Sequence, residues 1–280
     1  MTSVRRIARI SLITADVDRS AEFYRQAFGF EPAEPEAWDE QEIAALIAVP
    51  GGRARLGVLR LGSEAIELIA FTPPGKPYPP DSTSLDPWFQ HFAIVVADMR
   101  AALARLRAVP GWTAISAAGP VHLPESSGGV TAFKFRDPEG HPLELLQFPP
   151  DRTPPAWQAR PADGPCLGID HSAIVVANTA TSVDFYRQLG FAVTGGSLNR
   201  GDAQERLDSA PGAEVDVTAL AVPGAPGPHL ELLCYRSPRP RPALPMAGND
   251  VAATRLVLEA TGSDPPVLLR DPDGHALLLG

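Results

Sequence analysis

The chain has few cysteines, no long apolar run and no excess of positive charge. Its two cysteines, Cys166 and Cys234, lie far apart and indicate neither a disulfide framework nor a paired metal motif. No segment approaches the roughly 20 apolar residues that span a bilayer, and the apolar run near the N-terminus is too short for a signal peptide. A net charge of −9 argues against nucleic acid or an anionic membrane as partner. These absences predict a soluble, cytoplasmic protein.

Apolar residues and proline, in contrast, are plentiful. The 280 residues exceed the length of one ordinary domain and indicate about two, and the hydrophobic share of 44% is ample for a packed core. Proline-rich segments at 72–87, 149–165 and 236–250 cannot continue a helix or a central strand. They divide the chain into four units, which are roughly 4–75, 88–150, 166–236 and 248–280.

The four units repeat one another. Three phrases recur in them: SAEFYRQAFGF (20–30) as SVDFYRQLGF (182–191), HFAIVV (91–96) as HSAIVV (171–176), and ELIAF (67–71) as ELLQF (144–148) and ELLCY (231–235). A degenerate copy of the last phrase, HALLLG, ends the chain at 275–280. Self-similarity at this spacing is typical of a repeated supersecondary unit.

Each unit begins with a predicted strand, continues with a helix and ends with further strands, a βαβββ order. Such a unit is an open sheet with one apolar face, so it needs a partner unit to cover that face. The fourth unit is too short for the full pattern, which predicts the loss of its helix and one strand. The predicted class is therefore α+β, with four βαβββ units, the fourth truncated. They form two domains, 1–150 and 166–280, joined by a linker at 151–165.

Charged side chains inside predicted strands are the strongest functional signal. His91 and His171 lie at the first strand of units two and three, and Glu144 and Glu231 lie in the last strand of the same units. A carboxylate among apolar neighbours needs compensation, which two imidazoles and two carboxylates on one divalent cation would supply. Such a set suits zinc, nickel, iron, manganese or cobalt. Any one of the four could simply face solvent, but the repetition in two units favours the metal.

Units one and four lack this pattern. Unit one carries Glu67, with Arg9 where the histidine would stand, and this pair predicts a salt bridge in an inactive site. Unit four carries Leu278 in place of the glutamate, and Ala253 or Thr254 in place of the histidine.

Together, the βαβββ repeats, the Phe-Tyr…Gly-Phe helix end, the DPEGHPLEL turn and strand, and the His/Glu placement resemble the vicinal oxygen chelate superfamily. That group includes glyoxalase I, extradiol dioxygenases, fosfomycin- and bleomycin-resistance proteins and several epimerases. The resemblance covers essentially the whole chain and implies two glyoxalase-like domains, in which two units enclose one metal with ligands from the first and last strands of both. Pairing in sequence order gives no complete ligand set. Pairing units two and three gives one working site with His91, Glu144, His171 and Glu231.

Four protein ligands on a six-coordinate cation leave two positions for substrate oxygens. The cation would act as a Lewis acid and stabilise an enediolate as a neighbouring C–H proton leaves. The resemblance implies that Glu144 or Glu231 detaches and acts as the base. This arrangement predicts a lyase, isomerase or epimerase for a small oxygenated substrate, as a monomer or a homodimer. An extradiol-type dioxygenase and a non-catalytic drug-binding protein are the alternatives.

The polar segment at 197–208 is a further candidate for substrate contact. It offers Asn199 and Arg206 to an anionic substrate. A solvated loop is the other interpretation of the same residues.

Overall fold

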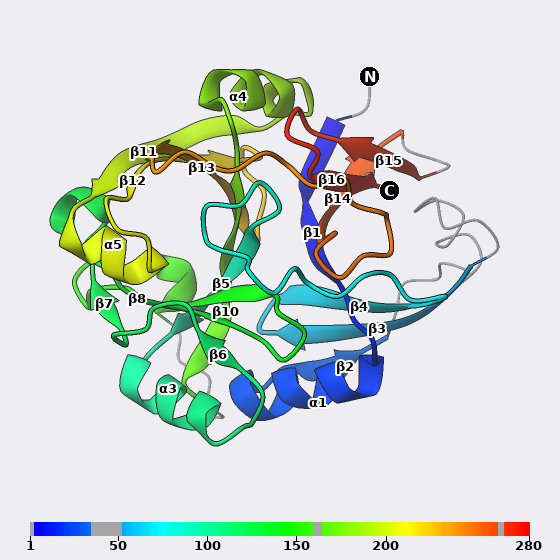
Figure 1. Ribbon diagram of the computed structural model, residues 1–280, viewed down its shortest axis with the longest axis horizontal. Helices are drawn as coiled ribbons and strands as arrows, with labels where there is room; N and C mark the ends of the chain where they lie inside the picture. The colour runs from blue at the N-terminus through cyan, green and yellow to red at the C-terminus, as the bar shows by residue number, and fades with distance from the viewer. Residues whose placement is uncertain (1–2, 35–51, 159–163, 263–265) are drawn as a thin grey trace.

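A computed structural model describes residues 3–34, 52–158, 164–262 and 266–280 of the chain. Figure 1 shows two mixed sheets with helices packed around their outer faces. The architecture is α+β, as predicted. Among the described residues no helix is long and apolar enough to cross a membrane.

The first three units follow the βαβββ order. Unit one contains β1 (Ser3–Ile13), α1 (Val17–Phe28), β2 (Glu31–Ala33), β3 (Arg53–Leu61) and β4 (Glu64–Thr72). Unit two contains β5 (Gln90–Val96), α3 (Met99–Arg107), β6 (Thr113–Ala114), β7 (Val121–His122), β8 (Thr131–Arg136) and β9 (Pro142–Gln147). Unit three contains β10 (Cys166–Val175), α4 (Thr179–Gln188), β11 (Ala192–Arg200), α5 (Asp202–Asp208), β12 (Glu214–Ala221) and β13 (His229–Ser237).

Unit four is shorter, as expected. Its described residues form β14 (Arg255–Thr261), β15 (Val267–Arg270) and β16 (Ala276–Leu279), and none of them is helical. Short 3-10 turns at Glu125–Ser127 and Pro155–Trp157 complete the described elements.

The two sheets combine units from opposite halves of the chain. Sheet A has the order β15-β16-β14-β1-β4-β3-β2 and joins units four and one. Sheet B has the order β11-β12-β13-β10-β5-β9-β8-β6 and joins units three and two. The joining pairs, β14 with β1 and β10 with β5, are antiparallel. Unit two therefore pairs with unit three, which is the arrangement that completes the predicted ligand set.

The helices connect the units in a different pairing, which is unit one with unit two and unit three with unit four. Helix α1 begins at Asp16, whose side chain accepts hydrogen bonds from two backbone N–H groups of the first turn, and it ends at Gly29 with a φ of 83°. Its Tyr24 stacks on Phe92 of unit two, with ring centroids 6.3 Å apart, and donates a 2.8 Å hydrogen bond to Asp137. α1 also lies beside α3 in Figure 1. Helices thus join unit one to unit two, whereas strands join unit one to unit four.

The same contact recurs in the second half. Tyr186 of α4 donates a 3.1 Å hydrogen bond to Asp271 of unit four. The histidines of the two DP(E/D)G turns add a matching link, because His141 and His275 each lie 2.8 Å from a backbone carbonyl of the neighbouring unit. Both histidines thus make a structural contact between units.

Strand alternation separates the core from the site. Successive side chains point to opposite faces of a sheet, so Phe92, Leu143 and Leu145 enter the main core. His91 and Glu144, their neighbours in β5 and β9, therefore project from the opposite face of sheet B.

The two free cysteines differ in environment and should differ in reactivity. Cys166 is buried and Cys234 is half-buried, and burial raises the pKa of the Cys166 thiol to about 12 because the thiolate loses its hydration. We expect iodoacetamide at pH 8 to modify Cys234 in the folded protein and Cys166 only after unfolding. Peptide mass spectrometry distinguishes the two, and equal labelling of both in the native state would contradict the prediction.

Candidate functional site

A cavity of about 360 Å³ opens on the face of sheet B away from the core. Residues of units two and three line it together. They include all four predicted ligands, His91, Glu144, His171 and Glu231. Its size falls within the range of small-molecule sites.

The four ligands reach the cavity through matching strand registers. In sheet B, β5 and β9 place Ala93 opposite Glu144, and β10 and β13 place Ala173 opposite Glu231. His91 and His171 stand two residues before those alanines, on the same face of the sheet. The two pairs are therefore equivalent halves of one site.

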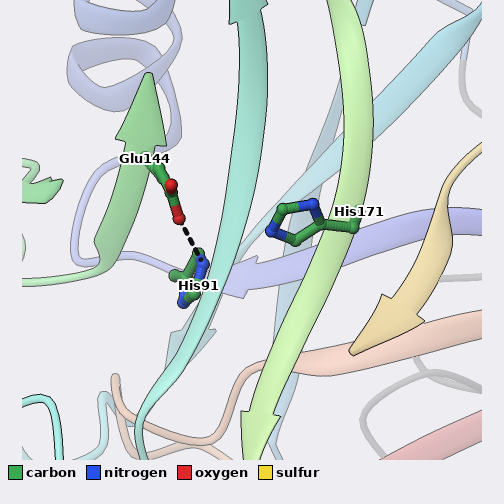
Figure 2. A group of neighbouring side chains, drawn as sticks. All are labelled: His91, Glu144 and His171. Carbon is green, nitrogen blue, oxygen red and sulfur yellow. Dashed lines mark ion pairs between the residues drawn. The ribbon is translucent and has the colours of Figure 1, made fainter. Parts of the chain in front are cut away.

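Figure 2 shows His91, Glu144 and His171 pointing toward one another, and one potential ligand atom from each lies within 4.8 Å of the others. His91 Nε2 is 2.9 Å from Glu144 Oε2, and the two imidazole rings are 5.6 Å apart. Glu231 completes the set, because its Oε2 lies 3.6 Å from His171 Nε2.

The hydrogen bonding of the imidazole nitrogens indicates whether a cation fits between these residues. Both ring nitrogens of His91 and the Nε2 of His171 are buried and have no hydrogen-bond partner among the described residues. The 2.9 Å approach of Glu144 to His91 is an ion-pair distance without hydrogen-bond geometry. Buried polar atoms without partners are costly, and a divalent cation between the two rings would satisfy one nitrogen of each. The nitrogen and oxygen donors present therefore fit such a cation.

Burial and charge set the protonation of these groups. Burial, helped by the charge of Lys134, lowers the pKa of His91 despite its contact with Glu144. Burial acts in the same direction on His171, but Glu231 and Asp170 outweigh it and raise the pKa of His171 to about 9. Burial opposes ionisation of Glu231 too, and the charge of His171 overcomes it and lowers the pKa of Glu231 to about 2.

Asp170 is a functional residue that the sequence did not reveal. Its Oδ2 lies 3.1 Å from His171 Nδ1, and its Oδ1 accepts a 3.2 Å hydrogen bond from Trp157 Nε1. Consecutive strand residues normally face opposite sides, but the register of β10 is shifted between Ile169 and His171. Asp170 thus reaches the ring of its own neighbour and leaves Nε2 directed at the cavity.

His229 lies beside the predicted ligands. It pairs with His171 across β10 and β13, and its Nε2 is 3.6 Å from Glu231 Oε1. Its Nδ1 is 3.7 Å from Asp170 Oδ2. His229 therefore supports Glu231 from the side.

The two predicted substrate contacts have different positions. Asn199 lines the cavity and accepts a 2.7 Å hydrogen bond from Ser197. The structure does not bring Arg206 to the cavity, because residues 202–208 form helix α5 and not a loop. A side chain two positions along a helix is turned by about 200°. Gln204 thus lines the cavity, and Arg206 is half-exposed in a 3.0 Å ion pair with Asp202.

The equivalent positions of sheet A carry a different set of side chains. Arg9 and Glu67 form the predicted buried salt bridge, with 3.4 Å between Arg9 Nε and Glu67 Oε2. The prediction for unit four is wrong by one or two residues. Arg255 pairs with Ser11 as His91 pairs with Ala173, so Arg255 occupies the histidine position, and Ala253 and Thr254 precede the strand. Counting along the chain failed because unit four has lost the helix from which the other units are counted.

The fold agrees with the comparison to known proteins. The model of the Glyoxalase/Bleomycin resistance protein/Dioxygenase superfamily matches residues 6–145 and 168–279. The chain belongs to this superfamily, and the two matched segments are its two glyoxalase-like domains. No curated protein matches the chain.

Solved structures show the same fold over nearly the whole length. The crystal structure of glyoxalase I from Zea mays has a TM-score of 0.60 and 16% identity, and the match covers 99% of this chain and 92% of that one. A putative dioxygenase from Bacillus subtilis has a TM-score of 0.60 and 13% identity, with 99% and 85% covered. At these identities the likeness is one of fold.

Proposed function

We propose that this protein is a divalent-metal-dependent enzyme with one active site between units two and three. It would act as a lyase, isomerase or epimerase on a small oxygenated substrate. The observation that carries the proposal is the convergence of His91, Glu144 and His171 around unpartnered imidazole nitrogens, with Glu231 beside them, on the wall of a cavity.

His91, Glu144, His171 and Glu231 are the residues that would hold the cation. Bound there, a divalent ion supplies Lewis-acid polarisation of a substrate oxygen. Two of these metal ligands come from unit two and two from unit three, and the units meet at β5 and β10. The two units must therefore pair to form the site.

The two carboxylates differ in access to the cavity. The side chain of Glu231 is 22% exposed, and that of Glu144 is 7% exposed. We therefore assign to Glu231 the transfer of a proton to or from the substrate carbon next to the polarised oxygen. His229 holds the second oxygen of that carboxylate. Apolar side chains on the cavity wall, among them Leu123 and Leu146, limit the water around it.

Metal content tests the proposal directly. Wild type reconstituted with zinc, nickel, iron, manganese or cobalt should hold about one ion per chain, and His91→Ala and Glu144→Gln should lose it. Glu67→Gln makes the same chemical change at the equivalent position of sheet A and should keep the ion. Elemental analysis after gel filtration gives the ratio, and a wild type without metal would contradict the proposal.

The reaction class needs a second readout. Loaded protein incubated in D₂O with small 2-hydroxy ketones and 2-hydroxy acids should introduce deuterium at the carbon next to the oxygen, detected by proton NMR. Oxygen consumption with catechols, without such exchange, would instead indicate the dioxygenase alternative.

A further inference from the structure

Helix α5 closes one end of the cavity, which Gln204 and Leu207 line. It lies between β11 and β12 of unit three and packs against β7 and β8 of unit two. Its last residues are anchored there, because Ser116 donates a 2.7 Å hydrogen bond to the carbonyl of Leu207 and Ser84 a 3.2 Å one to that of Asp208. The helix is thus a fixed part of the wall.

A buried carboxylate at the end of α5 organises this wall. Asp208 accepts hydrogen bonds from Lys134 Nζ at 2.7 Å, from the Tyr235 hydroxyl at 2.8 Å and from Gln204 Nε2 at 2.6 Å. Lys134 and Asp208 form an ion pair, in which the carboxylate oxygens accept.

This network fixes the orientation of the Gln204 amide. The opposite orientation would put the amide oxygen 2.6 Å from a carboxylate oxygen, with two acceptors in contact. The NH₂ group therefore points at Asp208, and Oε1 points away from it. That oxygen is buried and has no hydrogen-bond partner among the described residues, although Gln204 lines the cavity.

We infer that Gln204 Oε1 is a substrate subsite that accepts a hydrogen bond from a hydroxyl or N–H group of the ligand. The inference rests on the proposed function for the other end of the ligand, which would hold the cation through two oxygens. It narrows the substrate class to small chelating molecules that carry a separate hydrogen-bond donor. A buried acceptor that is matched only by the right ligand discriminates strongly against analogues without the donor.

Hydroxamates test this subsite without knowledge of the substrate. Benzohydroxamate is the parent probe, because it chelates divalent ions through two oxygens, and its 2-, 3- and 4-hydroxy derivatives place a donor at three different distances. Calorimetry of the zinc-loaded wild type should show at least one hydroxy isomer binding about tenfold tighter than the parent.

The matched variant is Gln204→Met, which keeps the length of the side chain and removes the amide. It should retain its zinc and its affinity for the parent, and lose the tenfold gain for the hydroxy isomer. The inference is overturned if no isomer gains affinity in wild type, or if the gain persists in Gln204→Met. If the parent itself does not bind the zinc-loaded wild type, the chelating site of the proposed function fails as well, and the two failures are thereby told apart.

Discussion

Replacing Asp208 with asparagine should lower the free energy of unfolding by about 3–5 kcal/mol, because removal of one partner from a buried ion pair leaves the other charge uncompensated. The side chains of Lys134 and Asp208 are 5% and 0% exposed and lie 2.7 Å apart. Burial alone would lower the pKa of Lys134, but the charges of Asp208 and Glu144 outweigh it and raise that pKa. The variant removes Asp208, the largest of these compensating charges, and leaves the amino group of Lys134 buried without its partner.

Urea unfolding followed by circular dichroism measures this effect. Asp216→Asn is the matched control, because Asp216 pairs with Arg236 at 2.6 Å on the surface, and its loss should leave the midpoint nearly unchanged. The double variant Lys134→Met/Asp208→Leu removes both charges and should be more stable than Asp208→Asn, but less stable than wild type because Tyr235 and Gln204 lose their acceptor. Equal midpoints for Asp208→Asn and Asp216→Asn would contradict the expectation.

Asp170→Asn should weaken zinc binding by about 10–100-fold, since an outer carboxylate of this kind orients a ligating imidazole and raises its basicity. Asp170 is 3.1 Å from His171 Nδ1 and is itself held by Trp157. Trp157→Phe should therefore have a smaller effect in the same direction.

Competition with a chromophoric chelator gives the zinc dissociation constants. Asp271→Asn serves as the control, because Asp271 accepts a hydrogen bond from Tyr186 in the same way but belongs to unit four. That variant should bind zinc as the wild type does. An unchanged affinity in Asp170→Asn would show that His171 needs no orienting partner.

The sequence predicted the parts of the site that follow from repetition. His91 and Glu144, like His171 and Glu231, interrupt apolar strands at equivalent places in two units, and this recurrence was visible without coordinates. The pairing of units two and three followed from it, because only that pair gives a full set of ligands. The βαβββ order of units one to three was predicted for the same reason, whereas helix α5 of unit three was not.

The remainder of the site depends on features that the repeated phrases do not carry. Asp170 reaches His171 through a shifted strand register, which leaves no mark on the apolar pattern. Gln204 belongs to helix α5, which has no α-helical counterpart between the later strands of the other units among the described residues. Lys134 interrupts the strand Thr131–Arg136, but its partner Asp208 lies 74 residues further along the chain. Contacts of this range become apparent only when the two units are placed together.

The crossed arrangement of strands and helices makes each half of the chain incomplete. Without its other half, residues 1–150 would expose β1 and β5 as sheet edges, and the second half would expose β10 and β14. Unpaired edges bind other strands, so a separate half would assemble with a second copy or aggregate. Covalent linkage replaces that concentration-dependent encounter with an intramolecular one. One consequence concerns symmetry. Two identical halves would form two identical cavities, whereas the two sheets of a single chain can differ, so that one carries the cavity and the other a buried salt bridge.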